Sequence, residues 1–210
     1  MKWWKRLLVL LVAGWFAEHH AGNGTVGIEK HPVGIGGRTD LRRSDYVLHN
    51  GNAEITGCAA GVTALEIPAE IDGSPVTAVG DSAFLKQQKL QTVSLPDSVQ
   101  SIGTQAFSGC INLQEITVPA GTQSVGNSAF PAAPIWKGSA GDSVETLGSS
   151  VFSGCESLAE VQLSANLQKM GGSVFQNCTA LKTVAIPEQV QTLGGSTFSG
   201  CSRLYQSHCQ

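Results

Sequence analysis

The apolar residues of this chain recur with a period of 23 residues. The pattern Gly-x-x-x-Phe occurs six times, and successive phenylalanines are separated by 23, 23, 22, 23 and 23 residues. They are Phe84, Phe107, Phe130, Phe152, Phe175 and Phe198. A large apolar residue, leucine in five cases and Trp136 in one, follows each of them by six positions. This spacing is typical of a solenoid, in which each repeat forms one turn that buries its apolar side against its neighbours.

Each period also contains two short apolar segments. In the first, for example TVSLP (92–96), apolar and polar residues alternate, so Val93 and Leu95 face one way and Thr92 and Ser94 the other. A proline ends this segment, because proline cannot donate a hydrogen bond to a ladder. The second segment, for example VQSIG (99–103), leads into the glycine of the pattern. We expect the first segment to form a short strand and Gly103 to make the bend.

The repeats define the expected domain boundaries. Two strand-like stretches are joined by Asn50-Gly51, a dipeptide that favours a type I′ hairpin turn. We therefore expect an N-terminal cap and first repeat segment over 46–79, repeats over 80–204, and an irregular tail over 205–210. The pattern predicts an apolar strand after Leu204, but the sequence there reads YQSHCQ. This ending suggests either a truncated coding sequence or an end that a partner chain covers.

The first residues resemble an export signal. The basic start MKWWKR precedes an eleven-residue apolar run at 7–17, which is too short to span a bilayer and fits a secretory signal. We expect a signal peptide over 1–21, a flexible linker over 22–45, and a secreted or cell-surface protein without a membrane span after signal removal. An uncleaved, anchored N-terminus is the alternative.

The charge distribution argues against nucleic acid as a partner. Residues 1–50 contain seven Lys and Arg against four Asp and Glu, whereas residues 51–210 contain six against twelve. Binding to nucleic acid depends on clustered basic residues that release counterions from phosphates. The acidic balance of the main body therefore favours a protein partner.

The cysteines follow the repeat. Cys110, Cys155, Cys178 and Cys201 each come three residues after a repeat phenylalanine. Side chains in equivalent positions of stacked turns are parallel, which is the wrong direction for disulfide bonds, so we interpret these four as small buried apolar residues. Cys58 and Cys209 fall outside this register and are the better candidates for oxidation.

Catalytic and cofactor motifs are not found. The repeats contain no histidine, so no Ser/His/Asp or Cys/His set can be assembled there. The stretch GNGTVG (22–27) matches a dinucleotide pattern, but it is not followed by a helical sequence and is interpreted as linker. We predict no enzyme activity, no cofactor, and no catalytic, cofactor-binding or metal-binding residues.

The repeat resembles the BspA-type leucine-rich repeat family, whose units read L-x-x-V-x-I/L-P-x-x-V-x-x-I-G-x-x-A-F-x-x-C. The segment LQTVSLPDSVQSIGTQAFSGC (90–110) matches this pattern closely. The resemblance implies a mainly β, right-handed leucine-rich-repeat solenoid of about six 23-residue units, with one short parallel strand per repeat and an N-terminal β-hairpin cap. It also implies a secreted or surface-displayed protein that binds matrix proteins, host receptors or other cells.

One repeat departs from the pattern. The unit after Phe130 is one residue short, contains Pro131 and Pro134, and has Ala133 in the cysteine position and Trp136 in the leucine position. This departure is either sequence drift or a bulge that displays a binding loop.

The outward positions of the first segments are the candidate binding site. We call this set the candidate binding face: Thr92, Ser94, Glu115, Thr117, Glu160, Gln162, Thr183 and Ala185. These residues predict a polar, nearly uncharged surface of the kind that repeat proteins use to bind macromolecules. We expect non-enzymatic recognition or adhesion at the cell surface, through an extracellular or host protein such as a matrix protein or receptor. The alternative is a structural spacer, or a fragment of a larger surface protein, without binding activity of its own.

Overall fold

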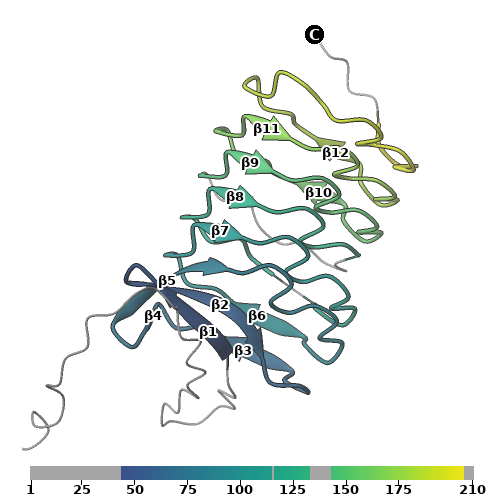
Figure 1. Ribbon diagram of the computed structural model, residues 1–210. Helices are drawn as coiled ribbons and strands as arrows, with labels where there is room; N and C mark the ends of the chain where they lie inside the picture. The colour runs from purple at the N-terminus through teal and green to yellow at the C-terminus, as the bar shows by residue number, and fades with distance from the viewer. Residues whose placement is uncertain (1–43, 115, 133–142, 206–210) are drawn as a thin grey trace, which may run out of the picture.

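Stacked turns of the 23-residue repeat make up most of the structure. The computed structural model describes residues 44–114, 116–132 and 143–205. Every regular element in these ranges is a β-strand, and the strands follow one another along the stack toward the C-terminus (Figure 1). They are β1 (Ser44–His49), β2 (Asn52–Cys58), β3 (Ala64–Glu66), β4 (Glu70–Ile71), β5 (Ser74–Val79), β6 (Thr92–Ser94), β7 (Ser101–Ile102), β8 (Ser124–Val125), β9 (Thr146–Leu147), β10 (Glu160–Val161), β11 (Lys169–Met170) and β12 (Thr183–Val184).

A β-hairpin caps the N-terminal end of the stack, as the sequence predicts. Strand β1 pairs antiparallel with β2, and Asn50 and Gly51 between them have φ angles of 50° and 78°, as a type I′ turn requires. Strand β1 begins at Ser44, two residues before the expected start of the cap. Strand β2 then pairs parallel with β5. The hairpin thus takes the place of a preceding turn and covers the first one.

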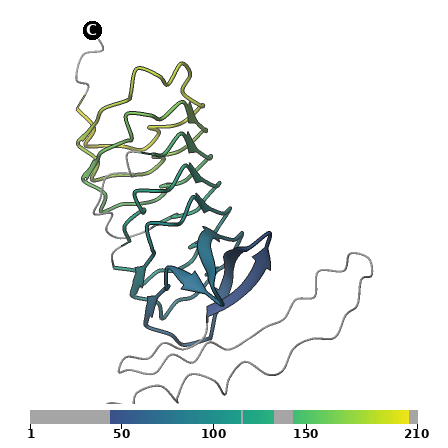
Figure 2. The ribbon, with the colours of Figure 1, turned by 90° about the vertical axis from the view of Figure 1, so that its left-hand side faces the viewer.

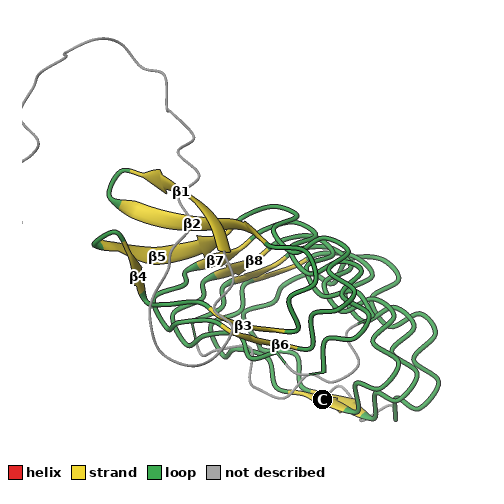
Figure 3. Ribbon diagram, turned by 90° about the horizontal axis from the view of Figure 1, so that it is seen from below, coloured by secondary structure: helices red, strands yellow, loops and turns green. Residues whose placement is uncertain are grey.

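Two ladders run along the stack rather than one. The second segment of each repeat forms the longer ladder, in which β5, β7, β8, β9 and β11 pair in parallel order (Figure 2). The first segment forms two shorter pairs, β3 with β6 and β10 with β12. Seen along the stack, β3 and β6 lie on the opposite side from β7 and β8 (Figure 3). The mainly β solenoid is confirmed, and each turn contains up to two short strands.

The bend of each turn is not made by the glycine of the pattern. Gly103 does not have a positive φ; the left-handed residues are Gln105 (φ 56°) and Gly109 (φ 77°), and the other turns repeat these positions. Gly103 is required for a different reason, because a Cβ atom there would lie 2.6 Å from the backbone nitrogen of Asp81 in the preceding turn. The expectation that Gly103 makes the bend is therefore wrong: it permits the close approach of two turns.

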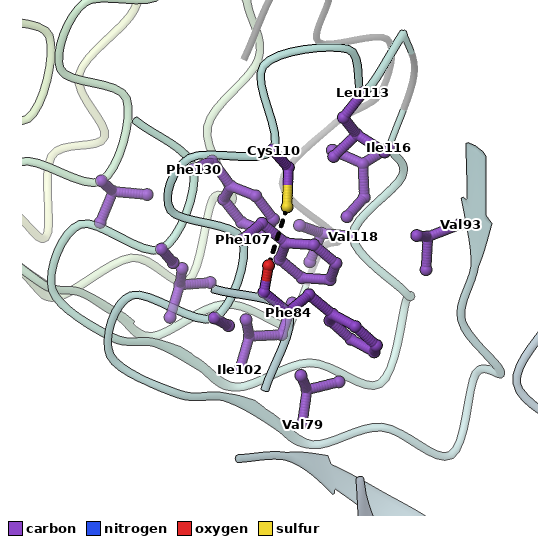
Figure 4. Packing of buried hydrophobic residues seen from close by; sticks show 14 of the residues in the cluster. Val79, Phe84, Val93, Ile102, Phe107, Cys110, Leu113, Ile116, Val118 and Phe130 are labelled. Carbon is purple, nitrogen blue, oxygen red and sulfur yellow. Dashed lines mark hydrogen bonds between the residues drawn. The ribbon is translucent and has the colours of Figure 1, made fainter. Parts of the chain in front are cut away.

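The six phenylalanines form a continuous column in the core. Neighbouring ring centroids are 5.0, 5.2, 6.1, 5.6 and 5.8 Å apart, in stacked orientation. The longest of these distances joins Phe130 and Phe152, the pair separated by 22 residues instead of 23. Apolar residues from both ladders, such as Ile102 and Val93, surround the rings (Figure 4).

Candidate functional site

The residues of the candidate binding face lie on the surface. All seven that the structure describes are exposed: Thr92, Ser94, Thr117, Glu160, Gln162, Thr183 and Ala185. The residues between them, Val93, Ile116 and Val161, are buried, so the alternation that predicts the face is correct. Glu115 lies outside the described residues.

The structure brings these residues together in two groups. Glu160 and Thr183 are partners in the β10–β12 pair. Thr92 and Ser94 are partners of Ala64 and Glu66 in β3, two exposed residues that sequence reasoning did not assign to the face. Between the two pairs, Ile116 forms only an isolated bridge, and residues 133–142 of the unusual repeat lie outside the described residues. Among the described residues, two strand pairs therefore contain four members of the candidate binding face: Thr92, Ser94, Glu160 and Thr183.

The longer ladder carries a second polar surface, which sequence reasoning did not identify. One exposed residue per turn forms a column that we call the glutamine ladder: Gln100, Gln123, Glu145, Gln168 and Gln191. Beside it, Ser101 pairs with Ser124, and Ser124 with Thr146. The available signal was a glutamine or glutamate three positions before the glycine in each of the segments VQSIG, TQSVG, VETLG, LQKMG and VQTLG. Because the buried residues Val99 and Ile102 are three positions apart, the period of two that indicates a strand is missing.

The repeat cysteines occupy the core and donate hydrogen bonds there. Cys110, Cys155 and Cys178 are buried, Cys201 is partly buried, and all four thiols are free. The Sγ atom of Cys110 donates to the carbonyl oxygen of Phe84 in the preceding turn over 3.0 Å (Figure 4). The other three repeat this contact over 3.0 to 3.2 Å. The prediction of small buried residues is thus confirmed, and the structure adds a link between turns.

The protein environment favours the neutral form of four thiols, those of Cys58, Cys110, Cys178 and Cys201. Burial raises the pKa of Cys110 to about 11, with a smaller contribution from nearby Cys58. Burial and the charge of Asp45 likewise raise the pKa of Cys58 to about 11. The pKa of Cys178 is raised by a hydrogen bond with Cys155 and by burial, and that of Cys201 mainly by burial. Because the thiolate is the reactive form, these residues are poor nucleophiles at neutral pH.

Cys58, an oxidation candidate by its position outside the repeat register, lies inside the stack. It is buried at the end of β2 and free, and it lies close enough to Cys110 to influence that residue's pKa. Cys58 is buried because the capping hairpin packs against the first repeat, in the place that a preceding turn would occupy. Cys209 lies outside the described residues.

The described residues contain neither a cluster of metal ligands nor a long apolar helix. In 44–114, 116–132 and 143–205, no group of three or more His, Cys, Asp or Glu side chains is arranged to hold a metal ion. Over the same ranges the chain forms no helix that is long and apolar enough to cross a bilayer.

Solved structures share this architecture. A leucine-rich repeat protein of T. pallidum superposes with a TM-score of 0.63 at 25% sequence identity, over 81% of this chain and 91% of that one. A leucine-rich repeat protein of Eubacterium ventriosum superposes with a TM-score of 0.52 at 20% identity, over 81% of this chain and 53% of that one. The latter similarity concerns the fold alone, and the chain spans about half of that protein's length.

The repeat pattern itself identifies the family. No curated protein matches the chain in sequence. The family model for the BspA type leucine rich repeat region matches residues 77–205 in six copies, which correspond to the six phenylalanine turns. The chain belongs to the BspA-type leucine-rich repeat family.

Proposed function

We propose that this chain is a non-enzymatic recognition protein that binds an extracellular or host protein, such as a matrix protein or receptor, at the cell surface. The observation that carries the proposal is the repeated display of exposed polar side chains over buried apolar columns. Such a surface is rigid, because the backbone beneath each side chain is held by the neighbouring turns. Binding to it costs little ordering entropy.

The chemistry of the described residues supports a binding role over catalysis. The thiols are the strongest potential nucleophiles in the repeats, and Cys110 and Cys178 are buried with raised pKa values. The acidic balance of residues 51–210 favours a protein partner over nucleic acid. The export signal expected at 1–21 and the family resemblance support a secreted or surface location.

The binding experiment uses the full chain and paired variants on the two ladders. Thr117→Arg with Gln162→Arg alters the candidate binding face, and Gln123→Arg with Gln168→Arg alters the glutamine ladder. All four residues are exposed, so folding should be unaffected. Saturable binding to immobilised matrix proteins and to host cells is measured for each protein.

We expect the first pair to weaken binding at least about tenfold and the second to leave it within about twofold. The reverse result would move the site to the glutamine ladder. A chain that binds no matrix protein and no cell would contradict recognition and leave the spacer function. Fractionation of cells that express the tagged chain tests the location, and purely cytosolic chain would contradict export.

A further inference from the structure

An Asn-Gly dipeptide forms the tip of the capping hairpin. Asn50 and Gly51 are both exposed, with φ angles of 50° and 78°, and the pair of His49 with Asn52 closes the turn between β1 and β2. A Cβ atom on Gly51 would have nothing within 4 Å. Among the described residues, Asn50 is the only asparagine that precedes a glycine. The turn therefore projects into open space, with room for both residues to move.

Hydrogen bonds do not hold the reactive groups of this turn. No described residue bonds to the side-chain amide of Asn50 or to the backbone N–H group of Gly51. Asn127 provides a contrast, because its Oδ1 atom accepts a hydrogen bond from the N–H group of Ser149 in the next turn over 2.7 Å. The amide of Asn50 and the backbone nitrogen that follows it are thus free to approach each other.

This arrangement allows the two residues to react with each other. When solvent removes the proton of the Gly51 nitrogen, that nitrogen can attack the Cγ atom of Asn50, and rotation about the Cα–C bond of Asn50 brings the two atoms together. The new C–N bond closes a cyclic imide, the Cγ–Nδ2 bond breaks, and the amide nitrogen takes up a proton and leaves as ammonia. Glycine favours this step, because it has no Cβ atom to crowd the ring and its backbone is flexible.

Water completes the reaction in one of two ways. If water opens the imide at Cγ, the original main chain is restored and residue 50 becomes aspartate. If water opens the imide at the main-chain carbonyl carbon, the main chain runs through Cβ and Cγ, and residue 50 becomes isoaspartate. The reaction transfers no electrons to or from another molecule, and water is its only co-reactant.

We propose that Asn50 is a deamidation site, at which water converts the side-chain amide to a carboxylate through a cyclic imide with Gly51. The modification adds a negative charge at the tip of the capping hairpin. The site is separate from the candidate binding face and does not depend on it.

The two products affect the cap differently. Aspartate can keep the left-handed conformation of Asn50, since both residue types tolerate it. Isoaspartate adds one atom to the main chain of a two-residue turn, whose geometry fixes the pairing of His49 with Asn52. The next pair along the hairpin joins Leu48 to Ala53, which is fully buried. Formation of isoaspartate therefore loosens the tip of the hairpin that covers the first turn.

The full chain is incubated in mildly alkaline buffer made with water enriched in heavy oxygen, then digested and mapped by mass spectrometry. We expect residue 50 to show the mass change from amide to carboxylate, with a heavy oxygen atom incorporated. Conversion at Asn50 should exceed that at Asn127 by about tenfold or more, because Asn127 precedes a serine and is held by its hydrogen bond. Equal conversion at the two residues, or an Asn50 that stays unchanged, would overturn the proposal.

Two variants separate the modification from its effect on the cap. Asn50→Gly retains a residue that favours the type I′ turn but cannot react, and freshly purified Asn50→Asp has the charge of the products with an unaltered main chain. Amide hydrogen exchange in β1 and β2 should be faster by about threefold or more in the isolated isoaspartate form than in the fresh wild-type chain. It should be unchanged in incubated Asn50→Gly and in fresh Asn50→Asp. Equal exchange in the isoaspartate form and in Asn50→Asp would overturn the effect on the cap, as would faster exchange in incubated Asn50→Gly.

Discussion

The thiol of Cys110 is packed like an apolar side chain and bonded like a polar one. It is 5% exposed, and its Sγ atom donates to the carbonyl oxygen of Phe84. The same carbonyl oxygen also accepts a hydrogen bond from the backbone N–H group of Gln87 over 3.2 Å, so the thiol is its second donor. Thr122 makes a similar contact between turns: its buried hydroxyl group donates a hydrogen bond to the carbonyl oxygen of Val99 over 3.0 Å. Residues that look apolar in the repeat pattern thus also join successive turns.

We predict a loss of stability at alkaline pH that depends on these thiols. The folded protein raises the pKa of Cys58 and Cys110 from 9.0 to about 11, so it favours the neutral form. This contribution is complete below pH 9 and is lost as the pH rises toward 11, by up to about 2 kcal/mol per thiol. Urea unfolding at pH 7, 9 and 10.5 under reducing conditions measures the effect.

The control for this pH prediction is Cys110→Ser, whose hydroxyl can still donate but does not titrate in this range. The free energy of unfolding should decrease less between pH 9 and 10.5 in the variant than in the wild type. Parallel curves would contradict the prediction.

At the scale of the element, the distance between turns depends on glycine. A Cβ atom at Gly126 would lie 2.5 Å from the backbone nitrogen of Thr104, closer than real Cβ contacts. Asp81 and Asn127 strengthen the same junction, because their Oδ1 atoms accept hydrogen bonds from the backbone N–H groups of Thr104 and Ser149 over 2.6 and 2.7 Å. The two-residue strands of the longer ladder are therefore held together largely by the glycines and the side-chain hydrogen bonds next to each strand.

We predict that Gly126→Ala destabilises the fold by about 2–3 kcal/mol, because two backbone segments must separate. The matched control is Gly195→Ala, where an added Cβ atom has nothing within 4 Å and the φ angle is not positive. Its free energy of unfolding should change by less than about 0.5 kcal/mol. Thermal or urea unfolding of both variants tests the comparison, and a large loss for Gly195→Ala would show that the turn spacing is set elsewhere.

At the scale of the whole molecule, the two ends of the stack differ. The β1–β2 hairpin covers the first turn, whereas Phe198 and Leu204 in the last described turn are only partly buried. In a linear stack, each turn gains stability from its neighbours on both sides. Among the described residues, the last turn has such a neighbour on one side only.

We therefore predict that the same substitution costs more in the middle of the stack than at this end. Phe152 lies between Phe130 and Phe175, at centroid distances of 6.1 and 5.6 Å, so Phe152→Ala should cost about 3–5 kcal/mol. Phe198 is partly buried and stacks on Phe175 alone among the described phenylalanines, at 5.8 Å. Phe198→Ala should cost about 1–2 kcal/mol. Chemical denaturation measures both, and equal losses would mean that the end turn is packed as tightly as the middle.

The sequence pattern predicted the exposure of the candidate binding face but not its strand partners. The alternation in TVSLP correctly predicted that Thr92 and Ser94 are exposed and that Val93 is buried. It could not show that Ala64 and Glu66 lie beside them, because strand partners are set by how turns stack. That these residues bind a partner remains a prediction.

The sequence by itself determined the period, the core columns and the capping hairpin. It could do so because each turn has nearly the same neighbours, so a repeated residue has a repeated environment. The tertiary structure decided which segment forms the longer ladder, where the backbone bends and what the thiols bond to. These features arise from contacts between turns: a Cβ atom at Gly103 would meet Asp81, and Cys110 donates to Phe84.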